Sequence, residues 1–308
     1  MLDIRPISPE LAAIAQNECF EVPERMEEDV KTLRYWIEKS PYIRANLTDQ
    51  GLVSILRASK YSLEKAKKKI DVGLTVRTLM PEMFSNLYPI TDQMKEILDL
   101  GIQCPLPLAG PDAPRVLLNR DGLNDPQKHN IYDIMKVNGM CGDLLFSTCD
   151  NFAISGFAAV IDQQFLTFEH IKQMNPTFIK KMAYAFQEGS PYRLKGLHFI
   201  NFSPWIVKIF NFFKMFLNEK TKSRIYVHES LEELYKYVPR KILPSEYGGE
   251  AGPVDTLVKE FNKFVLENEE FFKTQQMLGT DEKKRPGKPK TSESVFGLEG
   301  SFRQLEFD

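Results

Sequence analysis

The chain has 308 residues, which is enough for one large domain and a smaller partner, so it is not too small to bury a core. Its 40 Lys and Arg residues nearly balance its 42 Asp and Glu residues. This balance excludes a strongly basic or acidic protein, and any attraction to nucleic acid or to an anionic membrane must come from local clusters of charge.

The cysteines and the N-terminal segment indicate the cellular compartment of the protein. Cys19, Cys104, Cys141 and Cys149 lack the Cys-x-x-Cys spacing of a redox or zinc site, which favours free thiols in a reducing compartment. The N-terminal segment MLDIRPISPELAAIAQ has no basic stretch followed by an apolar one, and no apolar run reaches the roughly 18 residues that a membrane-spanning helix needs. We therefore expect a cytoplasmic protein that is neither secreted nor integral to a membrane.

The first third of the chain has a helical pattern. Apolar residues recur at helical spacing over residues 8–100, Ser62 is suited to cap one of the helices, and Pro81 marks the end of that helix. The lysine-rich stretch 65–69 is interpreted as a solvated helix face. We expect residues 1–95 to form a helical N-terminal module.

After the connector CPLPLAGPDAP, short β-rich runs alternate with helical patterns. Near-continuous apolar strands separated by helices favour a mixed α/β domain, with a mostly parallel sheet covered by helices, over residues 96–253. The segments expected to be strands are 115–120, 152–162, 195–201 and 224–228, and the segments expected to be helices are 131–146, 176–187 and one beginning at Pro204.

Residues 254–308 are expected to form a C-terminal helix and an extended tail. The helix is predicted from Val254 to about Thr274. The following segment DEKKRPGKPKTSES is too polar and rich in proline to pack a core, so it is a linker or a surface-bound tail. The closing run VFGLEGSFRQLEF is apolar enough to dock back on the body of the protein.

The segment 204–217, PWIVKIFNFFKMFL, is unusually apolar. Its strongly polar side chains, Lys208, Asn211 and Lys214, fall on one narrow helical stripe. A surface helix needs an apolar arc only somewhat wider than 100°. This helix is therefore either sandwiched in the core, or it covers a cavity with one side and meets lipid with another.

Basic residues are concentrated around this segment. Between Arg193 and Arg224 there are seven Lys or Arg residues and one acid, Glu219. A Lys or Arg beside an anionic membrane is worth about 1 kcal/mol, so four of them would give roughly a thousandfold in partitioning. The excess indicates reversible docking on a membrane, and scattered solubilising charges remain the alternative.

Three runs in this order, RLKGLHFIN, FNFFKMFLNEKTKSRI and LPSEYGGEAGP, resemble the CRAL-TRIO lipid-binding family, especially its alpha-tocopherol-transfer-protein-like members. DQGLVSILRASKYSLEKAKKKI is similar to the helical module that precedes that domain, and GTDEKKRPGKPKTSE is similar to the endings of arthropod members. The resemblance covers most of the chain. It implies an α/β domain enclosing a hydrophobic pocket, a mobile lid helix at about 203–217, and a phosphoinositide headgroup site.

The resemblance also implies site residues. The positions that match the headgroup site are Arg193, Lys195, Lys220 and Arg224. The candidate pocket residues, each also consistent with plain core, are Asn138, Phe146, Phe157, Ile161, Phe165, Phe168, Ile179, Met182, Phe186, Ile206, Phe210 and Phe213.

Some positions depart from the family pattern. Met215 stands where the lid usually has proline. Asn138 and Gly142 stand where the tocopherol-binding member has small hydroxyl residues, which weakens tocopherol as the ligand. Asn138 is also consistent with an ordinary helix-surface amide.

We therefore expect an intracellular, monomeric carrier of a small hydrophobic ligand, such as a tocopherol, retinoid, carotenoid or similar lipid, that exchanges its ligand at phosphoinositide-containing membranes. A phosphoinositide-binding regulatory adaptor and a phospholipid transfer protein are the alternatives. A lipid-acting enzyme has less support, because no GxSxG, P-loop, GxGxxG or HExxH motif occurs and His198 is interpreted as a core residue. We expect no catalytic residue, cofactor, metal or nucleic-acid partner.

Overall fold

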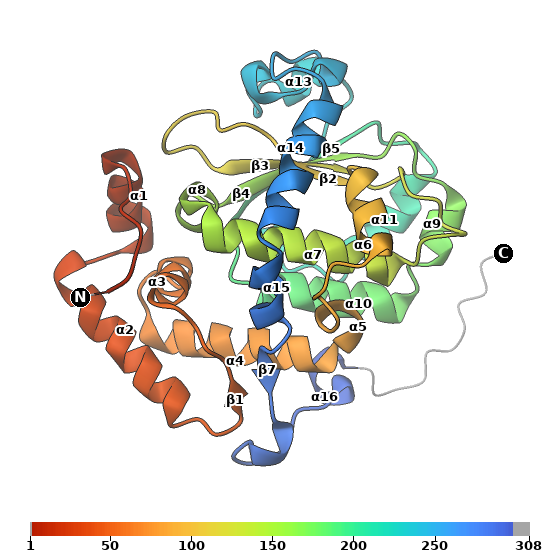
Figure 1. The fold of residues 1–308 in the computed structure, drawn as a ribbon. Coiled ribbons are helices and arrows are strands. Elements are labelled where there is room, and N and C mark those ends of the chain that lie inside the picture. The colour runs from red at the N-terminus through yellow and green to blue at the C-terminus, as the bar shows by residue number, and fades with distance from the viewer. Residues whose placement is uncertain (1, 298–308) are drawn as a thin grey trace.

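The centre of the protein is a five-stranded sheet in a computed structural model that describes residues 2–297 (Figure 1). The strand order is β2-β3-β4-β5-β6, in which β2 is antiparallel to β3 and all other neighbours are parallel. The strands are β2 (Gln103–Pro105), β3 (Arg115–Arg120), β4 (Phe157–Asp162), β5 (Leu194–Ile200) and β6 (Ile225–Val227). The predicted mixed, mostly parallel sheet covered by helices is confirmed.

Both faces of the sheet are buried, which explains why the strands are almost continuously apolar. Side chains alternate between the two faces of a strand. In β3, Leu117 packs under helix α7 (Ile131–Thr148), whereas Val116 and Leu118 pack under α13 (Leu231–Leu234) and α14 (Val254–Glu267). Figure 1 shows α7 and α14 crossing the sheet region as the long central helices.

Helices make up most of the N-terminal part, as predicted. The side chain of Ser62 accepts a hydrogen bond from the Lys65 amide and so caps α4, and Pro81 begins the next helix. These helices are α1 (Pro9–Cys19), α2 (Pro23–Glu38), α3 (Asp49–Ala58), α4 (Leu63–Leu79), α5 (Pro81–Phe84) and α6 (Asp92–Asp99). The remaining helices of the sheet domain are α8 (Asp150–Ile154), α9 (Phe168–Lys172), α10 (Pro176–Tyr184) with a π-helical turn over Ala185–Gly189, α11 (Ile206–Lys214) and α12 (Glu219–Lys222).

The prediction of one strand over residues 152–162 was wrong in its first half. Residues up to Ile154 end helix α8, and the strand begins only at Phe157. Gly156 makes the turn with φ of +89°, and a Cβ atom there would lie 2.2 Å from the Arg193 carbonyl oxygen. An apolar run alone does not distinguish a buried helix from a buried strand.

The predicted helix over residues 254–274 is interrupted. It breaks at Asn268 into α14 and α15 (Glu269–Gln275). A two-stranded sheet of β1 (Ile43–Arg44) and β7 (Gly279–Thr280) was not predicted, because two-residue strands carry no detectable alternation.

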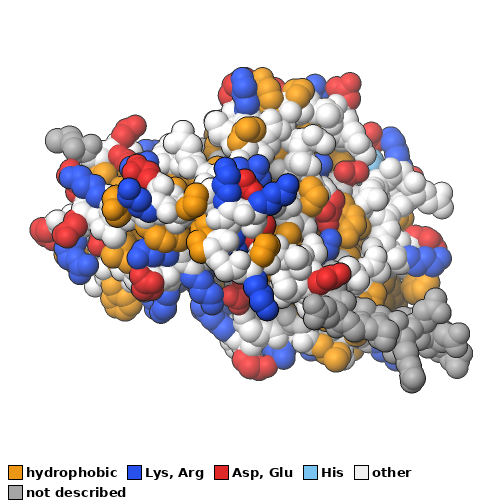
Figure 2. Space-filling view, turned by 90° about the horizontal axis from the view of Figure 1, so that it is seen from below, with side chains coloured by type: hydrophobic (Ala, Val, Ile, Leu, Met, Phe, Trp, Pro, Cys, Tyr) orange, Lys and Arg blue, Asp and Glu red, His pale blue; other side chains and the backbone are white. Residues whose placement is uncertain are grey.

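The tail beyond β7 is bound to the surface of α4. Arg285 and Lys290 each contact Asp71 at 2.7 Å, and the Arg285 guanidinium lies 4.1 Å from the centre of the Tyr42 ring. Helix α16 (Ser292–Phe296) then places the Phe296 ring in a buried position. The rest of the predicted docking run, 298–307, lies outside the described residues. Figure 2 shows acidic and basic side chains intermingled on this side of the molecule, in keeping with the balanced composition.

A buried ion pair fastens the N-terminal helices together. Arg57 of α3 binds Glu21 through Nε and Oε2 at 2.6 Å, and the two side chains are only 3% and 6% exposed. The Tyr61 hydroxyl donates a further hydrogen bond to Glu21 at 2.9 Å. The carboxylate is thus paired and hydrogen-bonded, as a buried charge requires.

Replacing Arg57 by Met should therefore lower the free energy of unfolding by about 3–5 kcal/mol, because Glu21 would remain buried without its cation. Urea denaturation measures the change. Lys31→Met, which removes an exposed pair with Glu27, is the control and should cost less than about 1 kcal/mol. Equal losses in the two variants would contradict the importance of the buried pair.

Candidate functional site

A cavity of about 690 Å³ lies between the sheet and the helices that cover one of its faces. Its walls come from strands β3, β4 and β5 and helices α7, α10 and α11, and it extends to α3 and α4. Ligand pockets of proteins have volumes of about 300–1,000 Å³ and are mostly apolar. The cavity is thus large enough for one small hydrophobic molecule.

Most of the predicted pocket residues line this cavity. They are Asn138, Phe146, Phe157, Ile161, Ile179, Met182, Phe186, Ile206, Phe210 and Phe213. Phe165 and Phe168 do not line it: they lie after β4 and at the start of α9, with 53% and 60% of their surface exposed. They were predicted because they match elements that enclose the pocket in the family, but here they follow the end of β4 at the surface. That the lining residues contact a ligand stays a prediction.

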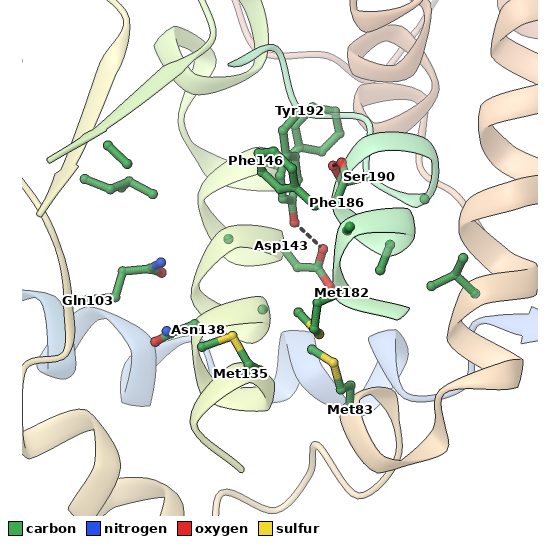
Figure 3. A pocket seen from close by; sticks show the side chains of 18 of the residues that line it. Met83, Gln103, Met135, Asn138, Asp143, Phe146, Met182, Phe186, Ser190 and Tyr192 are labelled. Atoms are coloured by element: carbon green, nitrogen blue, oxygen red, sulfur yellow. Dashed lines mark hydrogen bonds between the residues drawn. The ribbon is translucent and has the colours of Figure 1, made fainter. Parts of the chain in front are cut away.

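A polar network that the sequence analysis missed supports one wall. The Tyr192 hydroxyl donates to Asp143 Oδ1 at 2.7 Å, and the Arg77 guanidinium binds the other oxygen of that carboxylate. Burial, with the charge of Asp143, raises the pKa of Tyr192 well above its ordinary value, so the hydroxyl keeps its proton. Figure 3 shows this contact beside Phe146 and Phe186. Nothing in the sequence indicated that residues 77, 143 and 192 would meet.

Helix α11 covers the cavity. Its inner side places Ile206, Ile209, Phe210 and Phe213 on the cavity wall. Its outer side and ends leave Trp205, Val207 and Met215 exposed by 41%, 42% and 74%. The helix therefore has apolar side chains on both sides, as the second of the two sequence-based alternatives required.

The end of this covering helix is fastened to the π-helical turn. Gln187 donates from Nε2 to the Phe216 carbonyl oxygen at 3.0 Å, and its Oε1 accepts from the Asn218 amide at 2.6 Å. Asn218 in turn caps the short helix α12, which carries Lys220. One side chain thus joins the wall of the cavity, the end of its cover and the segment with the basic residues.

The four predicted headgroup residues lie in one basic region. Burial lowers the pKa of Lys220, and the positive charges of Arg224, Lys60, Arg193 and Lys65 lower it further. Within residues 2–297, no carboxylate forms an ion pair with Lys220. Lys60, in the turn between α3 and α4, and Lys65 of α4 were not among the predicted site residues.

An acidic residue of α1 occupies part of the basic region. Glu18 Oε2 lies 2.7 Å from Arg193 Nη2 and 2.9 Å from Lys195 Nζ. The hydrogen bond from Lys195 is the main cause of a lowered pKa at Glu18. A carboxylate held by two cations shows that the region accommodates an anion.

Two of the histidines pair with each other. His198 and His228 are buried, with Nδ1 and Nε2 at 3.0 Å, and burial lowers the pKa of His198 to about 4, which keeps it neutral. In the described part of the chain, no three His, Cys, Asp or Glu side chains are grouped as metal ligands. No helix between residues 2 and 297 is both long and apolar enough to cross a membrane.

Comparison with known proteins matches the sheet domain and the N-terminal helices to separate family models. Residues 103–249 match the CRAL/TRIO domain, and residues 22–94 match the Pinta-like UBA domain. The chain is 32% identical over 269 residues to alpha-tocopherol transfer protein-like of Mus musculus, covering 86% of this chain and 77% of that protein. This chain belongs to the CRAL/TRIO family.

Two further relatives and one solved structure are similar to this CRAL/TRIO protein. Identity is 30% over 269 residues to the Homo sapiens alpha-tocopherol transfer protein-like, covering 86% and 77% of the two chains. It is 27% over 263 residues to Clavesin-1 of Rattus norvegicus, covering 81% and 71%. The structure of Sfh5 aligns with 14% identity and a TM-score of 0.49 over 87% of this chain and 99% of that one. The family and its relatives indicate lipid binding or transfer, and the arthropod resemblance stays a prediction.

A carboxyl group lies in one wall of the CRAL/TRIO cavity. Burial raises the pKa of Asp121 to about 6, and a hydrogen bond from Gln163 Nε2 at 3.3 Å offsets only part of this effect. Between pH 4 and 6 the folded protein therefore binds more protons at Asp121 than the unfolded chain does. Stability contributed by this group falls as the pH rises through that window.

Asp121→Asn should remove the loss of stability that ionisation of Asp121 causes as the pH rises. At pH 7.5 we expect the variant to be more stable than the wild type by on the order of 2 kcal/mol, and the difference should vanish below about pH 4. Thermal or urea unfolding across pH 4–7.5 measures it, with the exposed Asp112→Asn as the control for loss of a carboxylate. A pH-independent difference would contradict the raised pKa.

Proposed function

We propose that this CRAL/TRIO protein is an intracellular carrier that encloses one small hydrophobic molecule and exchanges it at phosphoinositide-containing membranes when α11 opens. The observation that carries the proposal is the cavity of about 690 Å³ covered by a helix that is apolar on both sides. The inner side serves the ligand, and the outer side serves the bilayer. A tocopherol, a retinoid, a carotenoid or a similar lipid is the proposed class of cargo.

Hydrophobicity alone does not extract a lipid from a membrane. Burial of each CH₂ gains about 0.8 kcal/mol relative to water, but a bilayer offers the same gain. The shape of the cavity and its few polar groups must therefore provide selectivity. Displacement of α11 must also be favoured at the membrane. This requires a contact between protein and membrane that is stronger when α11 is displaced than when it covers the cavity.

The exposed residues of α11 and the nearby basic region supply such contacts in the proposal. Trp205, Val207 and Met215 would enter the interfacial layer of the bilayer. The headgroup phosphates of a phosphoinositide would bind Arg193, Lys195, Lys220 and Arg224. Gln187 and α12 connect these cations to the end of the lid, so binding of the headgroup and displacement of α11 would be coupled. The protein would act as a monomer, without catalysis, and associate reversibly with membranes.

Native mass spectrometry of the full chain purified from its own tissue, followed by lipid extraction, tests the carrier proposal. We expect one hydrophobic molecule per chain, because the cavity has room for one small ligand. Protein that neither retains nor takes up such a molecule would overturn the proposal. Conversion of the extracted lipid by the protein would favour a lipid-acting enzyme instead.

The paired charge reversal Lys220→Glu and Arg224→Glu tests the membrane step. Loss of two cations at the surface should weaken binding to phosphoinositide vesicles at least about thirtyfold, and ligand transfer to those vesicles should fall accordingly. Ligand binding in solution should not change. Lys263→Glu is the control, because it reverses the charge of an exposed lysine on α14 that does not belong to the basic region.

Two other results of this experiment decide between proposals. Unchanged transfer by the double variant would remove the basic region from the mechanism. Phosphoinositide binding by the wild type without any transfer of ligand would favour the regulatory adaptor.

Glu18→Gln should have the opposite effect to the charge reversals. Because Glu18 holds Arg193 and Lys195, its neutralisation frees both cations for a phosphate group. We expect binding to phosphoinositide vesicles to strengthen roughly fivefold, which corresponds to about 1 kcal/mol for a partly exposed ion pair. Vesicle co-sedimentation measures it, and weaker binding would contradict the assignment of the site.

A further inference from the structure

Two amide side chains interrupt the apolar wall of the cavity where β2 pairs with β3. Gln103 and Asn119 are directly opposite each other in this antiparallel pair, and both line the cavity. They lie on the same face of the sheet as Leu117, which also lines the cavity. Residues in this relation have Cβ atoms about 4.5–5.5 Å apart, so the two amides are close neighbours.

Both amides carry an oxygen without a partner. Gln103 Oε1 and Asn119 Oδ1 are buried, and neither accepts a hydrogen bond from any part of the chain that the structure describes. Buried polar atoms in proteins are almost always paired, because an unpaired one has lost its hydration and gained nothing. These two amides do not pair with each other, and because both residues line the cavity, a bound ligand could supply the missing partner once an amide turns toward it.

The amides can adjust to a partner in the cavity. The terminal torsion of an Asn or Gln side chain is broad and roughly two-fold, so either the oxygen or the NH₂ group can be turned toward the cavity. A ligand hydroxyl both donates and accepts, and so it matches two neighbouring amides. A hydrocarbon matches neither.

The two amides lie in a polar part of the cavity that is separate from its aromatic part. Asn138 of α7 also lines the cavity, and Figure 3 shows Gln103 and Asn138 well separated from Phe146 and Tyr192. Farther along β3 the cavity meets the Asp121 carboxyl, which lies at a turn beyond the strand. A second carboxylate brought to this end would face a like charge in a poorly solvated site.

We propose that Gln103 and Asn119 form a polar subsite that selects a neutral hydrophobic molecule bearing a hydroxyl group, in preference to the corresponding hydrocarbon or carboxylate. This inference rests on the proposed carrier function and specifies the class of its cargo. Gln103 and Asn119 are specificity residues, since the apolar wall provides most of the contact area and the amides decide which end group is accepted.

Equilibrium binding of three probes of equal chain length, hexadecan-1-ol, hexadecane and hexadecanoate, to the full-length protein at pH 7.5 tests the subsite. The wild type should bind the alcohol at least about tenfold more tightly than the alkane or the carboxylate. Gln103→Leu and Asn119→Leu should each reduce the ratio between alcohol and alkane toward one, mainly by weakening binding of the alcohol.

Leu118→Met is the matched control, because it changes a buried residue of β3 on the opposite face of the sheet, outside the cavity wall, without adding or removing a polar group. It should keep the preference for the alcohol. Circular dichroism and melting temperatures establish that the variants fold.

The outcomes separate this inference from the carrier proposal. Equal binding of alcohol and alkane by the wild type, or an unchanged ratio in both leucine variants, would overturn the polar subsite and leave the carrier proposal standing. Failure of the wild type to bind any of the three probes would overturn both. The wild-type comparison needs no variant, so a folding defect in a variant does not remove the test.

Discussion

The cavity beneath α11 is the feature on which the other properties of the protein depend. Protein interiors are normally packed to the density of organic crystals, so a space of about 690 Å³ persists only if its walls cannot collapse together. Here one wall is a sheet whose opposite face is packed against α13 and α14. Another wall is braced by the contacts of Arg77, Asp143 and Tyr192. Elements that are packed or braced on their far sides thus surround the space, and α11 lies over it.

The same arrangement brings apolar and charged groups together at the opening. The cover of the cavity continues through Phe216 and Asn218 into α12, and Gln187 binds both of these residues. Lys220 follows within one turn and lies among other cations, while Glu18 from the first helix holds two members of the group. Because Gln187 joins the end of α11 to α12, and Lys220 of α12 lies among the other cations, the proposed function couples an anion at the basic region to the position of α11. In the proposed function, this coupling confines exchange of the ligand to the membrane.

Much of the fold was predictable because its signals are local. Strand β3 and helix α7 were predicted directly from their apolar patterns. The cap of α4 is also local, because the Ser62 side chain accepts a hydrogen bond from the amide of Lys65, only three residues along the chain. The errors arose where local patterns are ambiguous. The apolar run from Phe152 contains both the end of a helix and a strand, and the turn at Gly156 is imposed by its close approach to the Arg193 backbone. The pairing of β1 with β7 joins residues more than 200 positions apart, and no local pattern encodes it.

For the site, the sequence by itself determined the composition of the parts: a short helix too apolar for one buried face, a surplus of basic residues beside it, and aromatic residues on the neighbouring elements. These follow from side-chain chemistry and spacing alone. Only the tertiary structure decided which residues meet, since contacts such as Glu18 with Arg193 or Gln103 with Asn119 join segments that are brought together by the packing of the sheet and helices. It also excluded Phe165 and Phe168 from the cavity wall. The orientation of a side chain, inward or outward, depends on where its strand or helix ends, and that end is set by contacts across the fold.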